Sequence, residues 1–128
     1  MTQDQGSTFD AFRHAESLVA QRRPLDALVA LGPVLDAEPD APSVHLLAGR
    51  AYLGSAQLRR AETAFLRVLE LDPTDHYARF ALGKTLQRQS RLTEAQTQLR
   101  IAVAMNPLPE YQEALGEVNA RIAVDRDR

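Results

Sequence analysis

Residues 42–75 read PSVHLLAGRAYLGSAQLRRAETAFLRVLELDPTD, and the pattern of this stretch returns 34 positions earlier and 34 positions later. Pro39, Pro73 and Pro107 lie at that interval. Two sets of small residues share it, and these are Ala15, Gly49 and Gly83, and Ala27, Ala61 and Ala95. A fixed period of this length is typical of a repeat protein, in which similar units of secondary structure stack side by side.

The large apolar residues of the central stretch recur at helical spacing. Tyr52, Phe65 and Val68 form an apolar stripe with Leu58, Leu69 and Leu71, whereas a strand would show strict alternation. Gly49 and Ala61 stand where two antiparallel helices must approach to roughly 8–10 Å, because only a small side chain permits that distance. Proline follows the second helix of each unit and stops it. The sequence therefore predicts an all-α fold without strands.

The order of residues within each unit carries a family resemblance. The first unit has Ala15, Leu18, Ala27, Leu31, Val34 and Pro39; the second has Gly49, Tyr52, Ala61, Phe65, Val68 and Pro73; the third has Gly83, Leu86, Ala95, Leu99, Ala102 and Pro107. This order resembles the tetratricopeptide repeat (TPR), a helix-turn-helix unit. The resemblance covers residues 8–124 and implies an α-solenoid of three repeats closed by a seventh, capping helix.

The resemblance gives the expected domain organisation. A flexible N-terminus (1–7) precedes a single TPR domain (8–124), made of repeats 8–41, 42–75 and 76–108 and a capping helix at 109–124. A flexible charged tail (125–128) follows. Pro33 lies inside the second helix of the first repeat, where it removes a backbone donor, so we expect a kink or an early end there.

Composition narrows the class of protein. The net charge of -2 argues against a broad nucleic-acid footprint, and the absence of cysteine excludes disulfides, thiol nucleophiles and zinc-thiolate sites. No secretory signal is visible in residues 1–10, and no segment is apolar enough to span a bilayer, so we expect a cytoplasmic protein that does not bind membranes. Lys84 is the only lysine beside 14 arginines, a bias that suggests a GC-rich bacterial genome.

The sequence offers little catalytic chemistry. It has no glycine-rich phosphate loop, no His-Glu-x-x-His pair and no nucleophile elbow, so we expect neither an enzyme nor a cofactor. His14, His45 and His76 fall on successive first helices, and a shared metal is conceivable. Separate, partly exposed histidines are the simpler interpretation.

A TPR array implies a concave groove lined by one face of its first helices. The family draws this face from the second, fifth, ninth, twelfth and thirteenth places of each unit. Here the face contains Phe9, Phe12, Glu16, Ser43, Leu46, Arg50, Leu53, Tyr77, Phe80, Lys84, Gln87 and Arg88. The packing between helices accounts for Tyr52, Phe65 and Tyr111, but it does not require the four aromatic residues of this face. The alternative for Phe9 and Phe12, which begin an end helix, is that they fill the gap under their own hairpin. Exposed aromatic side chains beside arginine are typical of a binding surface.

The charges of the groove suggest the chemistry of its ligand. Arg50, Lys84 and Arg88 are its cations, and if they are unpaired they favour an anionic group flanked by apolar side chains. TPR modules that bind chaperone C-termini hold the terminal carboxylates with lysines, asparagines and an arginine on these helices. The corresponding places hold Phe12, Glu16, Leu47, Tyr77 and Ala81, so the sequence predicts that this clamp is absent.

Three functions remain open at this stage. The first is a protein-protein interaction scaffold that binds a peptide or protein segment in the groove. The alternative is self-assembly, in which apolar patches or the end helix bury against another copy. The third is a metal-binding protein or enzyme built around the histidines. Either terminus could also occupy the groove of a neighbour.

Overall fold

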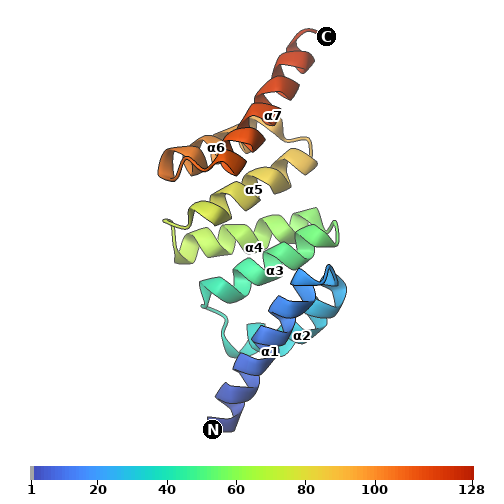
Figure 1. The fold of residues 1–128 in the computed structure, drawn as a ribbon, viewed down its shortest axis with the longest axis vertical. Coiled ribbons are helices and arrows are strands. Elements are labelled where there is room, and N and C mark those ends of the chain that lie inside the picture. The colour runs from blue at the N-terminus through green and yellow to red at the C-terminus, as the bar shows by residue number, and fades with distance from the viewer. Residues whose placement is uncertain (1) are drawn as a thin grey trace.

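The computed structural model describes residues 2–128, with side chains from Gly6 onward, and it consists of seven helices (Figure 1). They are α1 (Thr2–Ala20), α2 (Pro24–Ala37), α3 (Pro42–Gly54), α4 (Leu58–Leu71), α5 (His76–Arg88), α6 (Leu92–Met105) and α7 (Pro109–Arg126). Each helix packs against the next one in the chain, and residues 2–128 contain no strand. The termini lie at opposite ends of an elongated stack. The prediction of an all-α solenoid is confirmed.

The three hairpins share one turn geometry. Arg22, Ala56 and Ser90 have φ angles of 60°, 61° and 60°, and they stand 34 residues apart. In each turn the next backbone N–H donates to a carbonyl near the end of the preceding helix, as Gln57 does to Tyr52 at 2.8 Å. This left-handed residue caps the first helix and reverses the chain. The repeat therefore fixes the turns as well as the helices.

The core confirms the roles of the small residues. A Cβ atom placed at Gly49 would lie 2.5 Å from the ring of Phe65, and one placed at Gly83 would lie 2.7 Å from Leu99. Phe65 and Leu99 are fully buried. Because real Cβ atoms do not approach so closely, glycine at these places lets the two helices of a repeat meet.

The expected early end of the second helix at Pro33 is wrong. Helix α2 continues to Ala37 with Pro33 inside it. Pro33 is exposed, and so is Val29, whose carbonyl has no donor at Pro33. Water can satisfy that carbonyl on the outer face, so the helix tolerates the proline.

The ends of the stack differ from the expected boundaries. Helix α1 begins at Thr2, inside the segment for which the sequence predicts a flexible N-terminus. Helix α7 runs to Arg126, two residues into the predicted tail. Both end helices are longer than α3 and α5, and Figure 1 shows them projecting from the body of the stack.

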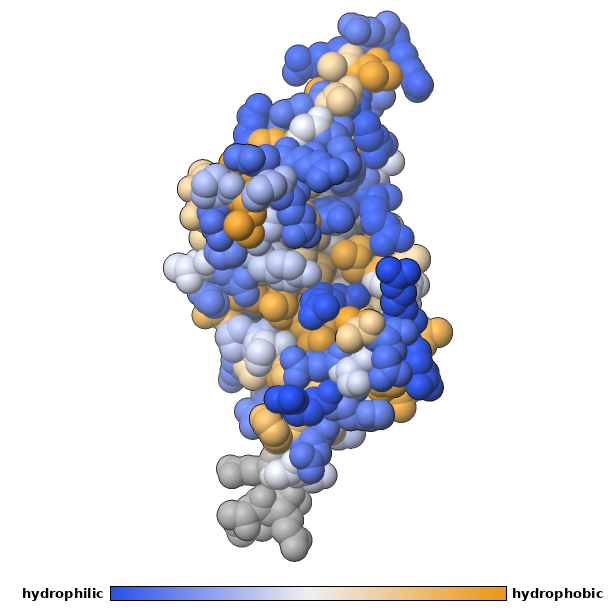
Figure 2. All heavy atoms as spheres, in the orientation of Figure 1, coloured by the Kyte–Doolittle hydropathy of each residue, from blue (hydrophilic) through white to orange (hydrophobic). Residues whose placement is uncertain are grey.

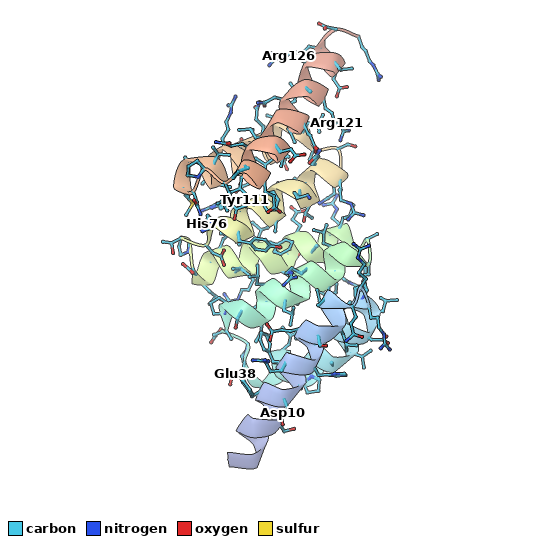
Figure 3. The ribbon with its side chains drawn as sticks, viewed as in Figure 1. Asp10, Glu38, His76, Tyr111, Arg121 and Arg126 are labelled. Atoms are coloured by element: carbon cyan, nitrogen blue, oxygen red, sulfur yellow. The ribbon has the colours of Figure 1, made fainter. Side chains whose placement is uncertain are left out.

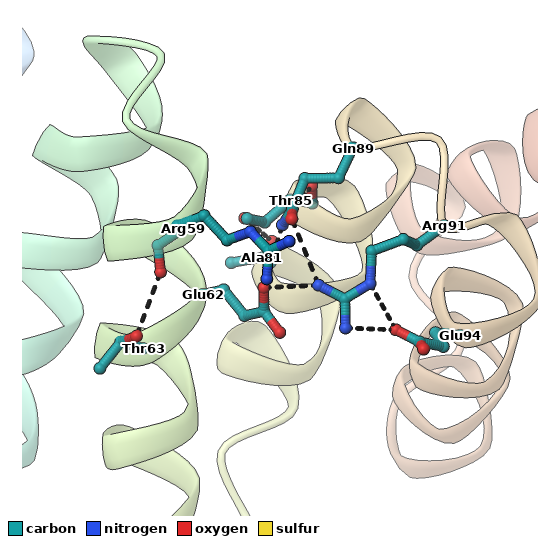
Figure 4. A network of polar contacts seen from close by, with 8 residues as sticks. All are labelled: Arg59, Glu62, Thr63, Ala81, Thr85, Gln89, Arg91 and Glu94. Atoms are coloured by element: carbon teal, nitrogen blue, oxygen red, sulfur yellow. Dashed lines mark hydrogen bonds and ion pairs between the residues drawn. The ribbon is translucent and has the colours of Figure 1, made fainter.

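A polar network joins the second and third repeats (Figure 4). Arg91 donates to Glu62 at 2.7 Å, and Gln89 donates to the same oxygen at 3.1 Å. Burial acts to raise the pKa of Glu62, but the hydrogen bonds from Arg91 and Gln89, together with the charges of Arg91 and Arg59, leave it below its ordinary value. The network therefore favours the ionised carboxylate and holds α4 against the turn between α5 and α6.

Candidate functional site

The first helices of the repeats lie side by side and carry the face predicted as a groove. Contacts join α1 to α3, α3 to α5 and α5 to α7. The predicted residues differ in how far they remain accessible. Seven are exposed, and these are Phe9, Glu16, Ser43, Arg50, Tyr77, Lys84 and Arg88. Four are half-buried, and these are Phe12, Leu46, Leu53 and Gln87.

Phe80 is the remaining predicted residue, and it belongs to the core. Its side chain is only 3% exposed, and its ring stacks on Tyr111 of α7 with centroids 4.6 Å apart. The expectation that packing does not require Phe80 is therefore wrong. The capping helix covers Phe80, and the register of that helix is the least regular part of the repeat pattern.

Helix α5 brings the predicted aromatic and cationic groups together. The Tyr77 ring lies 6.0 Å from that of Phe80, and the ammonium of Lys84 lies 5.4 Å from the Phe80 ring centroid. Tyr77 keeps 36% of its surface accessible. A cation held over an aromatic ring is positioned at low entropic cost, so this part of the face is ordered before a ligand arrives.

Helix α1 contributes a second aromatic pair in a different setting. Phe9 is 59% exposed and has the guanidinium of Arg13 5.8 Å from its ring centroid. Phe12 packs against the core cluster that contains Ala15 and Val44. Of this pair, Phe9 offers the larger accessible surface, while Phe12 fills the space beside its own hairpin.

The cations of the face have no carboxylate partner among the described side chains. Arg50 and Lys84 are exposed and form no ion pair with residues 6–128, and Arg88 donates to the backbone carbonyl of Leu53 at 3.1 Å. The acidic residue of the face, Glu16, already has Arg13 within 3.6 Å. The arrangement leaves positive charge available over α3 and α5, which can attract an anionic group.

The histidines form no common cluster. His14 is exposed, and His45 has Nε2 2.7 Å from the Pro39 carbonyl. His76 has Nδ1 2.8 Å from the Tyr111 hydroxyl and Nε2 3.3 Å from the Asn106 amide nitrogen. Among the described residues, no group of three or more His, Cys, Asp or Glu side chains could hold a metal ion.

Tyr111 is a residue whose importance the sequence understated. Figure 3 shows His76 and Tyr111 facing each other where α5 meets α7. Burial raises the pKa of the Tyr111 phenol, so this group stays neutral over the physiological range. Its contacts with Phe80 and His76 make it the anchor of the capping helix. The signal available in the sequence is the apolar stripe that Tyr111 begins.

An open cleft of about 470 Å³ lies on a different face of α3, between α2 and α4. Ala48 and Ala64 line it, where the next repeat has the larger Leu82 and Gln98. Its rim mixes charges, because Arg67 is paired with Asp40 and Glu70. On the face that Figure 2 presents, hydrophilic side chains divide the apolar surface into separate patches. No helix of the described chain is long and apolar enough to cross a bilayer.

Solved structures show how common this arrangement of helices is. The first TPR of Spaghetti (RPAP3), bound to the HSP90 peptide SRMEEVD, has a TM-score of 0.86 and 17% identity, covering 92% of this chain and 94% of that one. The second TPR domain of human RPAP3, in complex with the HSP70 peptide SGPTIEEVD, has a TM-score of 0.83 and 14% identity, covering 91% and 98%. At these identities the likeness concerns the fold alone.

A third similar structure belongs to an enzyme. The Thermobaculum terrenum O-GlcNAc transferase has a TM-score of 0.81 and 23% identity, and the match covers 92% of this chain but 23% of that one. A search of curated proteins gave no match. Two family models match, both described as tetratricopeptide repeat, one at residues 18–77 and the other at 64–97. Together they span more than half of the sequence, and the chain belongs to the tetratricopeptide repeat family.

Proposed function

We propose that this protein is a non-catalytic scaffold that binds an acidic, apolar peptide segment of a partner protein on the face formed by α1, α3 and α5. The observation that carries the proposal is the set of cations without carboxylate partners, Arg50, Lys84 and Arg88. Lys84 lies 5.4 Å from the ring of Phe80, and that ring lies 6.0 Å from the partly exposed ring of Tyr77. Apolar contact area next to positive charge suits a segment in which Asp or Glu alternates with large apolar residues.

Similar structures support a peptide ligand, but the chain differs from a receptor of chaperone tails. Two TPR domains of like fold are solved with HSP90 and HSP70 peptides. In this chain the places of the carboxylate clamp include Leu47 and Ala81, which are both buried and apolar. Such side chains cannot hold a terminal carboxylate, so the ligand we propose is recognised through side-chain carboxylates. The cytoplasmic location and bacterial origin stay predictions from the sequence.

The test is a peptide selection followed by affinity measurements. A displayed library of random 12-residue peptides is selected on the wild-type chain, and the enriched peptides are measured by fluorescence anisotropy. We expect enrichment of Asp and Glu beside large apolar residues. The Arg50→Glu and Lys84→Glu double variant should bind these peptides at least about tenfold more weakly, because two attractive charges become repulsive.

A matched control carries the same change of charge elsewhere. Arg22→Glu and Arg100→Glu alter two exposed arginines outside the face. Arg22 lies in the turn between α1 and α2, and Arg100 lies on α6. This control should retain wild-type affinity. Equal binding by the wild type and the groove variant, with both folded by circular dichroism, contradicts the proposal, as does a selection that enriches no acidic peptide.

A further inference from the structure

Helix α2 exposes two large apolar side chains one turn apart, whereas α4 exposes one, Leu66, and α6 exposes one, Met105. Leu25 is 63% exposed and Val29 is 79% exposed, and Pro33 follows one turn later, also exposed. A Cβ atom placed at Gly32 would meet nothing within 4 Å. Leu25, Val29 and Pro33 are four residues apart and therefore lie along one side of the helix, where they form a continuous stripe directed into solvent. We call Leu25, Val29, Gly32 and Pro33 the α2 stripe.

The other two repeats show what this position normally holds. The counterparts of Leu25 are Arg59 and Thr93, and those of Val29 are Thr63 and Thr97. All four are exposed. Since the same place is polar in two repeats of one chain, the fold itself does not require apolar side chains on α2. An exposed apolar stripe rimmed by charges is the pattern of an interaction surface.

Charges of opposite sign flank the two ends of the stripe. Arg22 lies in the turn before α2, with a φ of 60°, and Asp36 lies in the last turn of the helix. Both are exposed, and neither side chain has an ion-pair partner among the described residues. Leu25 and Pro33 stand four residues on either side of Val29. When two stripes run in opposite directions, the cation before one helix comes to the end of the other helix that carries the carboxylate.

We infer that two copies of this chain associate through antiparallel packing of their α2 stripes about a two-fold axis at Val29. In that arrangement Val29 meets Val29, Leu25 meets Pro33, and Arg22 of each copy meets Asp36 of the other. Gly32 lets the two backbones approach. The dipoles of the two helices oppose each other, which also favours the antiparallel pair.

Head-to-tail stacking of copies is disfavoured by the outer face of α1. In the second repeat the residues that pack against the preceding helix are buried and apolar, and these are Val44, Leu47, Ala48 and Ala51. Their counterparts in α1 are polar and exposed, and these are Asp10, Arg13, His14 and Ser17. A further repeat from another copy would leave those polar groups buried without partners.

The size of the stripe sets the strength of the pair. Fourteen residues of helix α2 span about 21 Å, and a stripe one side chain wide on it buries roughly 300 Å² per copy. A standard stable interface buries about 800 Å² per partner, so the dimer is weak, with a dissociation constant of about 10⁻⁴ M. It matters where copies are held close together, for instance by a partner with several binding segments.

The main test is sedimentation velocity on the full chain from 10 µM to about 1 mM, a range that brackets the expected constant. The wild type should pass from monomer to dimer across this range. Val29→Glu should raise the dissociation constant at least about tenfold, because it places two carboxylates opposite each other. Thr63→Glu, the same change at the matching place of the second repeat, should have no effect. A wild type that stays monomeric, or a dimer that Val29→Glu leaves unchanged, overturns the inference.

A charge exchange tests the antiparallel arrangement itself. Arg22→Glu and Asp36→Arg should each weaken the dimer severalfold, and the double variant should restore wild-type association, because each new charge again meets its opposite on the other copy. Failure of the double variant to recover overturns the two-fold arrangement. Arg50→Glu with Lys84→Glu should leave dimerisation unchanged, so this inference and the proposed peptide site fail or succeed separately.

The absence of cysteine allows a direct check of the symmetry axis. Val29→Cys places one thiol where two identical residues should meet. Mild oxidation should then give a disulfide-linked dimer that a reductant dissolves. Thr63→Cys should remain monomeric under the same conditions. Equal cross-linking of both variants would indicate random collision and would contradict the predicted contact.

Discussion

The two ends of this array are built differently. At the C-terminal end, α5, α6 and α7 share one large core with α4, and aromatic stacking between Phe80 and Tyr111 locks the last helix in place. At the N-terminal end the buried residues fall into two smaller clusters, and Phe9, Leu25 and Val29 remain exposed. In a repeat array, stability is close to the sum of unit and neighbour terms. The comparison indicates a firm C-terminal half and a more easily opened first repeat.

The substitution with the largest expected effect removes the Tyr111 side chain, which packs the capping helix against the C-terminal repeat. Tyr111→Ala should lower the free energy of unfolding by about 3–5 kcal/mol, because it empties a buried aromatic site. Urea denaturation followed by circular dichroism measures the change. Leu18→Ala, at a buried site of the first repeat, serves for comparison and should cost less. An equal or smaller cost at Tyr111 would remove the claimed difference between the two ends.

Overpacking between the helices of the second repeat should have a smaller effect. A methyl group in Gly49→Ala would press on the rigid ring of Phe65, and we expect a loss of about 1–2 kcal/mol after the better helix propensity of alanine is included. Gly116→Ala on α7 is the control, since a Cβ there meets nothing within 4 Å. That variant should be neutral or slightly more stable in the same denaturation experiment.

Native-state hydrogen exchange tests the difference in local stability between the two ends without any mutation. Amides of α2 should exchange roughly tenfold faster than those of α5, because the first repeat has a neighbour on one side only and opens locally at lower cost. Mass spectrometry of peptides from residues 24–37 and 76–88 gives the two rates. The measurement is made at about 1 µM, roughly a hundredfold below the expected dissociation constant of the dimer. Uniform protection across all seven helices would mean that the array opens as a single unit.

The smallest of the expected effects is the loss of stability in acid at the contact between the second and third repeats. The folded-state pKa of Glu62 is lowered, so its contribution to stability is present above the pKa of the unfolded chain, near 4.5, and is lost as the pH falls through the folded value. The first repeat has Leu28 at this position and lacks the effect.

The acid effect is checked by comparing urea denaturation at pH 7 and pH 3.5. Glu62→Gln should flatten the dependence of stability on pH, whereas Glu70→Gln, which alters an exposed carboxylate on the same helix, should change it less. If the wild type and Glu62→Gln lose the same stability in acid, the network of Arg91 and Glu62 does not hold the two repeats together.

The sequence could predict the fold because one period determines which residues face each other. The close approach of two helices at Gly49 was predicted from the repeat, and the structure adds the side chains opposite the glycines, Phe65 at Gly49 and Leu99 at Gly83. The candidate site was harder to predict, because access to a side chain depends on what covers it. Phe80 occupies a groove position by its place in the unit, yet the capping helix, whose register departs from the period, buries it.

The α2 stripe escaped prediction for a related reason. Leu25 and Val29 look like ordinary members of an apolar helix until the structure shows which side of α2 meets the core. The early end expected at Pro33 does not occur, because the cost of a proline inside a helix depends on whether the carbonyl that loses its donor is buried or solvated. Periodicity predicts neighbours, whereas solvent access has to be observed.

The shared turn geometry has a consequence for how this protein could be lengthened. Since Ala56 and Ser90 reverse the chain with nearly the same backbone angle, the second and third units are hairpins of the same design. In a chain with residues 42–75 duplicated after Asp75, the copy of α4 would meet α5 as α4 does now, and the copy of α3 would pack on the original α4 in the place that α5 occupies now. Such a chain would add one more hairpin to the solenoid, and with it another Arg50 and a longer stretch of positively charged binding surface.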